Sequence, residues 1–325
     1  MRNNDQWHPA TVRAHRDLTP TVREFEIRPE GGVVAWSVGS HLNVQVAIGE
    51  RLETRSYSLI GLPEAEVYRI AVKRADPGRG GSRWMWGLET GDELRIGEPN
   101  NHFELALGAP QYLLMAGGIG ITPLVGMASL LAGRGADLRL LYATRSDAEF
   151  AYGDRLRASL GERLELCADD AGRRIDVDAE IARLHPQGQL LACGPIPLLD
   201  AVKAAWQRAG RPPAQLRFET FGNSGAHAAE AFWIKLPRHG LELQVPADRS
   251  LLDVLEEAGV ETLYDCRRGE CGLCAMDIVS IAGTVDHRDV FFSADEKQQN
   301  RRLCTCVSRV SGGGVVLDSS YRPDA

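Results

Sequence analysis

Five of the seven cysteines lie in the last 60 residues of this 325-residue chain, with the spacing of a metal site. Cys266, Cys271 and Cys274 follow the pattern C-x4-C-x2-C, which holds plant-type [2Fe–2S] clusters. Such a cluster needs four thiolates. Gly269 and Gly272 let the main chain approach and point its N–H groups at the sulfurs. Zinc is the alternative metal, but structural zinc sites favour paired C-x2-C spacings, so we predict a two-iron cluster.

The fourth ligand is either Cys304 or Cys306. The two are two residues apart, so on a strand they would face the same side. Cys306-Val-Ser-Arg309 followed by the apolar run 315–317 resembles the ending of plant-type ferredoxins, where a final strand follows the last ligand. That resemblance favours Cys306, and Cys304 would then be a buried thiol with no role.

A glycine-rich turn and a Cys-Gly-Pro triplet indicate a nucleotide site. Met115-Ala-Gly-Gly-Ile-Gly-Ile-Thr-Pro123 joins an apolar strand to a helix, where main-chain N–H groups and the helix dipole attract anions. It lacks the full G-x-G-x-x-G fingerprint, so alone it is also compatible with a plain tight turn. Cys193-Gly-Pro195 ends a second strand of the same pattern. Because ligands bind at the carboxyl ends of such strands, the pair predicts a dinucleotide site.

A phosphate site is predicted upstream. Arg55-Ser-Tyr-Ser-Leu59 ends a strand-like run, and Arg55 offers a fixed cation. Gly78-Arg-Gly-Gly-Ser82 offers main-chain N–H groups and a hydroxyl for the same phosphate. Each piece alone would be an ordinary strand end or surface loop.

Three kinds of element must position these residues. Up to about Gly108, short alternating runs such as 22–27, 42–46 and 67–72 predict an antiparallel barrel or sandwich. After it, apolar strands alternate with helices, which predicts a parallel, doubly wound sheet. The expected elements are strands 112–116, 138–142 and 189–193 and helices 122–131, 147–160 and 196–208.

The last part of the chain has its own pattern. Residues 223–229 are small and polar without periodicity, as in a linker. Strands are expected at 231–236 and 241–245, and an amphipathic helix at 251–258 with Ser250 as its N-cap. The cysteine loop follows directly, and 315–317 is expected to be a closing strand.

The composition and charge of the chain argue against several classes of protein. The chain is 44% apolar and 25% charged, as in globular proteins, with a net charge of −7 that argues against nucleic-acid binding. The first 25 residues lack an apolar core, so no export signal is expected and we predict a cytoplasmic protein. Residues 112–133 are uncharged, but their five glycines and Pro123 favour a strand, turn and helix over a membrane span.

Taken together, the ordered motifs Arg-x-Tyr-Ser, Gly-Arg-Gly-Gly-Ser, Gly-Gly-Ile-Gly-Ile-Thr-Pro, Cys-Gly-Pro and a terminal cysteine loop resemble the phthalate dioxygenase reductase family. The resemblance covers nearly the whole chain. It implies a multidomain protein: an FMN-binding antiparallel β-barrel at 1–108, a parallel-sheet α/β NAD domain at 109–223, a linker at 224–229 and a β-grasp (α+β) ferredoxin domain at 230–325. It also implies electron transfer from NAD(P)H through FMN and the cluster to a Rieske-type terminal oxygenase.

The resemblance also carries residue roles. The residues expected to bind the flavin are Arg55, Ser56, Tyr57, Ser58, Ala71, Val72, Lys73, Arg79, Gly80, Gly81, Ser82, Thr122 and Phe221. Those expected to face NAD are Gly117, Gly118, Gly120, Cys193, Gly194 and Pro195. The expected cluster ligands are Cys266, Cys271, Cys274 and Cys306.

Two cofactor choices stay open at this point. Where the family prototype has an Asp after Thr144-Arg145, this chain has Ser146, so NADH is expected but NADPH is possible. FMN rather than FAD rests on the family's shorter barrel. The alternative functions are an FAD-containing reductase of another monooxygenase and a flavin and iron–sulfur redox sensor, although the sequence shows no output domain.

Overall fold

The computed structural model describes residues 6–75, 78, 80–221 and 227–319, which form two compact units. One unit ends at Glu219 and the other begins at Thr220. Residues 224–226 of the expected linker, and Arg79 of the expected flavin site, lie outside the described residues.

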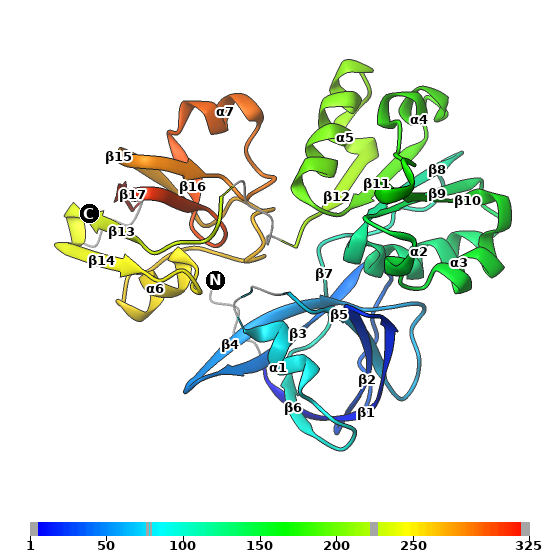
Figure 1. The fold of residues 1–325 in the computed structure, drawn as a ribbon, viewed down its shortest axis with the longest axis horizontal. Coiled ribbons are helices and arrows are strands. Elements are labelled where there is room, and N and C mark those ends of the chain that lie inside the picture. Colours follow the sequence, from blue (N-terminus) through cyan, green and yellow to red (C-terminus); the bar gives the residue numbers. More distant parts are fainter. Residues whose placement is uncertain (1–5, 76–77, 79, 222–226, 320–325) are drawn as a thin grey trace. The chain divides into compact units, whose positions relative to one another are not determined.

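The first unit begins with an antiparallel sheet in the strand order β4-β3-β6-β1-β2-β5, with β7 paired to β3 (Figure 1). A bridge between Leu59 and Ile70 joins the chain after β4 to β5 and closes the sheet into a barrel. The barrel elements are β1 (His8–Thr19), β2 (Val22–Pro29), β3 (Ser40–Ile48), β4 (Arg51–Ser58), β5 (Tyr68–Lys73), α1 (Gly81–Trp86), β6 (Glu93–Ile96) and β7 (Asn100–Asn101).

Apolar and polar residues alternate along these strands, and the apolar side chains form the barrel core. Phe25, Ile27, Leu42, Val44 and Ile70 have no solvent exposure and pack in one cluster. The runs expected at 22–27 and 42–46 lie within β2 and β3, and the run at 67–72 corresponds to β5. The expectation of a barrel or sandwich is thus met by a barrel.

A five-stranded parallel sheet follows in the order β10-β9-β8-β11-β12. Because β8 lies between β9 and β11, the carboxyl ends of β8 and β11 flank the point where the strand order reverses. The elements are β8 (Tyr112–Gly117), α2 (Ile121–Gly133), β9 (Leu138–Thr144), α3 (Gly153–Leu160), β10 (Leu164–Ala168), α4 (Val177–Arg183), β11 (Gln189–Cys193), α5 (Ile196–Arg208) and β12 (Leu216–Glu219).

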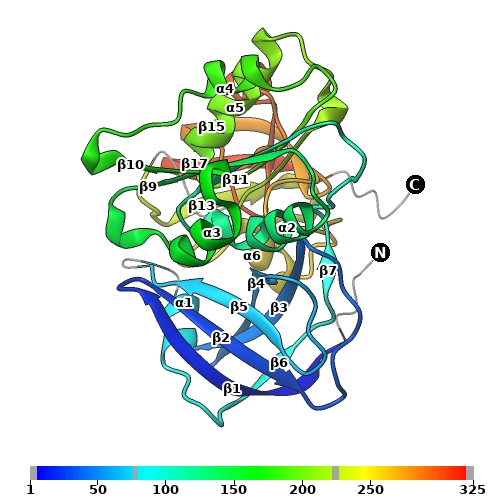
Figure 2. The ribbon, with the colours of Figure 1, turned by 90° about the vertical axis from the view of Figure 1, so that its right-hand side faces the viewer.

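Helix α2 joins this sheet to the barrel. In Figure 2, α2 and α3 lie between the parallel sheet and the barrel strands. A Cβ atom on Gly126 of α2 would overlap the main-chain oxygen of Gly61, which follows β4. The barrel and the parallel sheet therefore meet through direct main-chain contact, which only a glycine at position 126 permits.

The helix expected at 147–160 is wrong in its first half. Residues 147–149 form a 3₁₀ turn, and α3 begins only at Gly153. Tyr152 separates them with a left-handed φ of 62°. Its hydroxyl donates a hydrogen bond of 2.7 Å to the buried carboxylate of Glu24 in the barrel. This contact with a residue 128 positions away leaves no signal in the local periodicity.

The second unit is a mixed sheet in the order β14-β13-β17-β15-β16, in which β13 and β17 are parallel. Helix α6 has the expected N-cap, because the Ser250 hydroxyl and the Asp253 carboxylate cap each other's main-chain N–H groups. The elements are β13 (Phe232–Leu236), β14 (Leu241–Val245), α6 (Leu251–Glu257), β15 (Ala275–Asp286), α7 (Ala294–Gln299), β16 (Arg302–Cys304) and β17 (Arg309–Asp318).

The uncharged stretch 112–133 folds as the buried strand β8, a 3₁₀ turn (Gly118–Gly120) and α2, as expected from its glycines. Among the residues that the structure describes, no helix combines the length and the apolar character needed to cross a membrane.

Candidate cofactor sites

The cysteine loop wraps its main chain around a sulfur atom. The N–H groups of Arg268, Glu270 and Cys271 each point at Cys266 Sγ over 3.4 Å. Gly269 makes this possible with a φ of +75°. Main-chain N–H groups directed at sulfur stabilise a thiolate and tune a cluster bound to it.

Both loop glycines also sit where a side chain would not fit. A Cβ on Gly269 would come within 2.8 Å of Asp289 Cα. A Cβ on Gly272 would overlap the ring of Phe291, which lies across the loop. The glycines expected to shape the loop are therefore required by close neighbours as well as by their positive φ angles.

The cysteine thiols of this unit form two groups, Cys266 with Cys271, and Cys274 with Cys304 and Cys306. Cys266 and Cys271 are hydrogen-bonded, and this bond lowers the pKa of Cys271 to about 6 while raising that of Cys266. Cys274 Sγ and Cys306 Sγ lie 3.2 Å apart. Hydrogen bonds with the Cys304 and Cys306 thiols hold the pKa of Cys274 well below its usual range.

The two glycine-bearing motifs of the parallel sheet meet at its carboxyl edge. A Cβ on Gly120 would overlap the main-chain oxygen of Cys193. A Cβ on Gly117 would lie 2.6 Å from Cδ of Pro195, and one on Gly194 would lie 3.0 Å from the Gly117 nitrogen. The ends of β8 and β11 thus make an edge of nearly bare main chain, beside the N-terminus of α2, which suits a dinucleotide pyrophosphate.

Two buried side chains near this edge, Thr122 and Glu219, contact other atoms of the protein. Thr122 is buried, and its hydroxyl donates to the Ile119 carbonyl. Glu219 is 1% exposed at the end of β12, with one carboxylate oxygen 4.0 Å from Cys193 Sγ. Glu219 was missed by sequence reasoning. The available signal was its place two residues before Phe221 in the Phe-Glu-Thr-Phe motif, and Phe221 itself is partly buried.

The barrel brings Arg55 and Gly81 together, although they are 26 residues apart. A Cβ on Gly81 would lie 2.7 Å from Nε of Arg55, so the arginine stem crosses the start of α1. The Arg55 guanidinium also pairs with Glu53 over 2.7 Å and donates to the Thr54 carbonyl. The cation is thus held beside the Gly80-Gly81 main chain, as a phosphate site needs.

The other residues expected to bind the flavin differ in their hydrogen bonds and burial. Ser56 Oγ donates to Asn43 over 2.6 Å, and Ser82 Oγ accepts the Ala75 N–H. Burial raises the pKa of Tyr57. Ser58 Oγ is buried, and within the described residues it has no hydrogen-bond partner. This hydroxyl is available to a polar atom of a bound group.

The β5 residues differ in their surroundings. Ala71 and Val72 are buried, whereas Lys73 pairs with Glu149 of the parallel-sheet domain over 3.4 Å. Lys73 therefore contributes to the contact between barrel and sheet.

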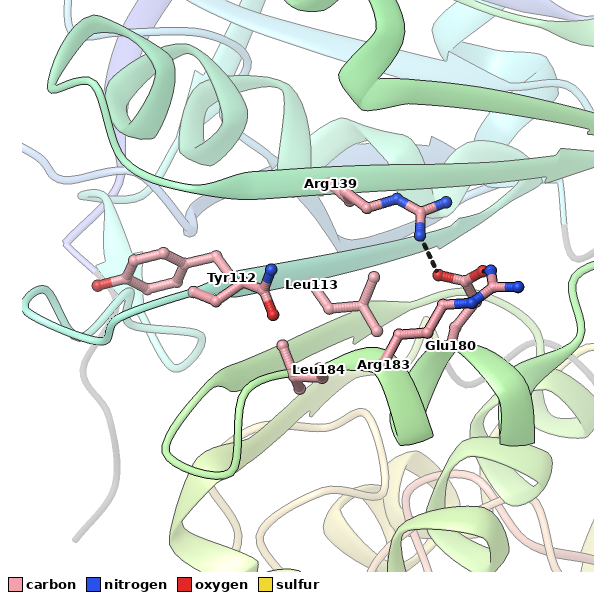
Figure 3. A pocket seen from close by; sticks show the side chains of 7 residues that line it. Tyr112, Leu113, Arg139, Glu180, Arg183 and Leu184 are labelled. Carbon is pink, nitrogen blue, oxygen red and sulfur yellow. Dashed lines mark hydrogen bonds and ion pairs between the residues drawn. The ribbon is translucent and has the colours of Figure 1, made fainter.

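A small pocket lies at the other edge of the parallel sheet (Figure 3). It is lined by Tyr112 and Leu113 at the start of β8, and by Arg139, Glu180 and Leu184. Arg139 and Glu180 form an ion pair of 2.7 Å. Because this edge holds the amino ends of the strands, the pocket is separate from the glycine edge, and none of the expected cofactor residues lines it.

Comparison with known proteins decides the family. The phthalate 4,5-dioxygenase oxygenase reductase subunit of Pseudomonas putida is 36% identical over 324 residues, covering 94% of this chain and 95% of the relative. The solved structure of phthalate dioxygenase reductase superposes with a TM-score of 0.78 at 31% identity, covering 97% of this chain and 98% of that one. The chain belongs to the phthalate dioxygenase reductase family.

Other relatives show how the family varies. The beta subunit of a heme-dependent oxidative N-demethylase from Ectopseudomonas mendocina (strain ymp) is 38% identical over 310 residues, covering 94% of this chain and 97% of the relative. Residues 234–311 match the 2Fe-2S iron-sulfur cluster binding domain family. This reductase is thus an NAD(P)H-dependent oxidoreductase with a flavin and a [2Fe–2S] cluster. The predicted fold class, with barrel, parallel α/β sheet and ferredoxin-like domain, is confirmed.

Proposed function

We propose that this reductase supplies a Rieske-type terminal oxygenase with electrons from NADH, using FMN and a [2Fe–2S] cluster. When bound, the flavin would supply hydride acceptance from a nicotinamide, and the cluster would supply one-electron transfer. The protein's own residues bind and orient these groups. The observation that carries the proposal is the cysteine loop, in which three N–H groups already converge on Cys266 Sγ.

The proposed cluster ligands are Cys266 and Cys271 for one iron, and Cys274 and Cys306 for the other. The 3.2 Å between Cys274 Sγ and Cys306 Sγ supports Cys306 as the fourth member of this set. The thiols of Cys271 and Cys274, whose pKa values are lowered, would be the first to be ionised at neutral pH. Metal binding requires deprotonated thiols, so two of the four ligands are already prepared for it.

The proposed flavin site is the barrel surface between Arg55 and Gly81. Arg55 would hold the phosphate together with the main chain of Gly80 and Gly81. Tyr57, Ser58, Ala71, Val72 and Thr122 would line the ring. Arg55 is fixed by Glu53 and Thr54, which supports a single phosphate held by a rigid cation. Releasing the flavin by heat and identifying it by mass would distinguish FMN from FAD.

NADH is the proposed electron donor, bound across Gly117, Gly118, Gly120 and the Cys193-Gly194-Pro195 segment. Ser146 follows β9 and would meet the adenosine ribose. The adjacent Asp147 forms an ion pair of 2.6 Å with Arg173. A ratio of kcat/KM for NADH and NADPH would test the preference, and a ratio near one would remove it.

The electron path is tested by anaerobic titration with NADH, followed by visible absorbance. The proposal expects the flavin and cluster bands to bleach together. Bleaching of the flavin alone would overturn it. Multiple turnover with an added one-electron acceptor also separates a reductase from a redox sensor, because a sensor has no need of sustained turnover.

The net charge of the C-terminal domain indicates what kind of surface the partner presents. From Glu230 onward the chain has 11 Lys and Arg against 16 Asp and Glu, so 11 − 16 gives a net charge of −5. An acidic domain favours a short-lived contact with a basic acceptor surface, and its rate should fall as salt is added. A rate indifferent to ionic strength would contradict this contact.

A heme-dependent oxidative enzyme is the second candidate partner, because one relative is a subunit of a heme-dependent oxidative N-demethylase. To distinguish the two candidate partners, the NADH-reduced protein is mixed with a purified Rieske oxygenase or with a purified heme-dependent oxidative demethylase. The preferred acceptor is the one whose spectrum changes at the higher rate under the same conditions.

A further inference from the structure

The turn between β9 and α3 begins beside the glycine edge. Strand β9 is parallel to β8, and its Ala143 is paired with Gly117. The chain therefore leaves β9 at the same edge of the sheet as the glycine turn, one strand away. Arg145 and Asp147, at the start of the turn, are exposed. In dinucleotide-binding sheets, a residue that follows this neighbouring strand contacts the adenosine ribose, so the turn is placed to do the same.

The start of the turn is held by the strand that precedes it. The Thr144 hydroxyl donates to the Ser146 carbonyl over 2.8 Å, and the Glu149 N–H donates to the same oxygen over 3.1 Å. The ring of Phe150 packs edge-on against Tyr142 of β9, with ring centroids 5.1 Å apart. These contacts fix the turn relative to the parallel sheet, and none of them involves the barrel.

The end of the turn is held by the barrel. The Tyr152 hydroxyl, which donates to Glu24 Oε2 over 2.7 Å, belongs to a side chain that is 6% exposed. The other oxygen, Glu24 Oε1, accepts a hydrogen bond of 2.8 Å from Arg16 Nε. Burial raises the pKa of Tyr152 well above its usual value, so the hydroxyl keeps its proton and remains a donor. Because both carboxylate oxygens are engaged, the acceptor for Tyr152 has one fixed orientation.

The backbone at Tyr152 is strained, and the strain is maintained by this contact. A bulky residue with a left-handed φ of 62° persists only where its surroundings hold it, and such residues cluster at ligand sites. Glu149, three residues earlier, pairs with Lys73 of β5 over 3.4 Å. The turn therefore meets the barrel at two points. Helix α3, which begins directly after Tyr152, lies on the barrel side of the sheet (Figure 2).

We propose that Tyr152 is a positioning residue for nucleotide binding, which fastens the turn 145–149 to the barrel through Glu24 so that the turn receives the adenosine half of NADH. This inference rests on the nucleotide site of the proposed function. NADH must place its nicotinamide at the flavin of the barrel and its adenosine at the turn at the same time. A turn fixed to the barrel sets the distance between these two points before the nucleotide binds, which lowers the cost of ordering the site.

The test compares two reductants of the full-length holoprotein, NADH and reduced nicotinamide mononucleotide, which lacks the adenosine half. Anaerobic stopped-flow absorbance follows reduction of the flavin. In Y152F the KM for NADH should rise severalfold, by up to about tenfold, the scale of a lost hydrogen bond to a charged group. The limiting rate of flavin reduction should equal that of wild type, because uniform binding alone is lost. The rate with the mononucleotide should not change, because this reductant does not reach the turn.

Two further variants complete the comparison. Y112F is the matched control, because Tyr112 is also a buried tyrosine of the sheet, but its hydroxyl donates to the Ala106 carbonyl over 3.1 Å at the opposite, amino edge. Y112F should keep the wild-type KM for NADH. E24Q retains an acceptor oxygen for Tyr152 without its charge, so its KM should lie between those of wild type and Y152F.

Two results would overturn the inference. One is an unchanged KM for NADH in Y152F, or in E24Q should Y152F fail to fold. The other is an equal loss of kcat/KM with NADH and with the mononucleotide, because the effect would then lie at the nicotinamide end. A wild-type protein whose flavin neither NADH nor NADPH reduces would instead refute the proposed function, so the two failures are distinguishable.

Discussion

The cysteine loop and the glycine edge bind their groups in opposite ways. In the loop, the reactive atoms are side-chain sulfurs, and the main chain supports them through N–H groups directed at Cys266. At the edge formed by Gly117, Gly120 and Gly194, the binding surface is the main chain itself, exposed by the lack of side chains. Removing an atom should therefore damage the first site, and adding one should damage the second.

The largest effect is expected from Cys274→Ser, which removes a proposed ligand thiolate. The cluster should be lost, with its visible absorbance and its paramagnetic signal. NADH should still reduce the flavin, because the glycine edge and the barrel are untouched. C167S, made in the parallel sheet, should keep a full complement of iron and sulfide. A C274S protein with a normal cluster would contradict the side-chain account of this site.

The next effect is expected from Gly120→Ala at the glycine edge. The added methyl group would overlap the Cys193 carbonyl, which belongs to a buried strand and cannot move freely. Overpacking of this kind costs about 1–3 kcal/mol, which urea unfolding would measure. The affinity for NADH should fall as well, while the cluster stays intact.

Gly133→Ala is the matched control for G120A. Gly133 ends α2, and a Cβ there would meet nothing within 4 Å. The free energy of unfolding should change by less than about 0.5 kcal/mol. Equal destabilisation by both substitutions would show that steric overlap at the edge is not the cause.

A smaller effect is expected from Gly118→Ala. This substitution tests the effect of backbone conformation without the effect of steric overlap. A Cβ at this position would meet nothing within 4 Å, but φ is +54°. Alanine in this region costs about 1–2 kcal/mol, so the loss of stability should be smaller than in G120A. G118N should lose less than G118A, since asparagine tolerates the left-handed region. Identical losses in G118A and G118N would remove the conformational argument.

The subtlest prediction concerns thiol reactivity in protein stripped of its cluster. The hydrogen bond with Cys266 lowers the pKa of Cys271 to about 6, whereas burial raises that of Cys167 to about 11. Because the thiolate is the nucleophile, alkylation of Cys271 should rise through pH 6 and level off by pH 7. Cys167 should stay unreacted across that range. Mass spectrometry of peptides after brief iodoacetamide treatment would follow both residues.

The same contrast explains what could be predicted from the sequence. The cysteine loop depends on residue identity at short spacing, so C-x4-C-x2-C was enough to predict a cluster. The parallel sheet was predicted from apolar runs, and α5 begins and ends where its pattern predicted. Local patterns carry this information because the stabilising contacts are local or repeat with a fixed period.

Long-range contacts account for what was missed. The break at Tyr152 depends on Glu24, a residue of the barrel. The burial of Glu219 against Cys193 depends on two strands that are neighbours only in the folded sheet. Arg55 and Gly81 were expected to share one phosphate, but the passage of the Arg55 side chain across the start of α1 was not predicted, because the two segments are neighbours only in the folded barrel.

The main-chain contact between Gly126 and Gly61 has a practical consequence for building chimeric reductases. A barrel transplanted without its own α2 would meet a helix whose surface was shaped for a different loop. Barrel and dinucleotide domain should therefore be exchanged together as one cassette, with the exchange point placed after Glu219, where the first compact unit ends.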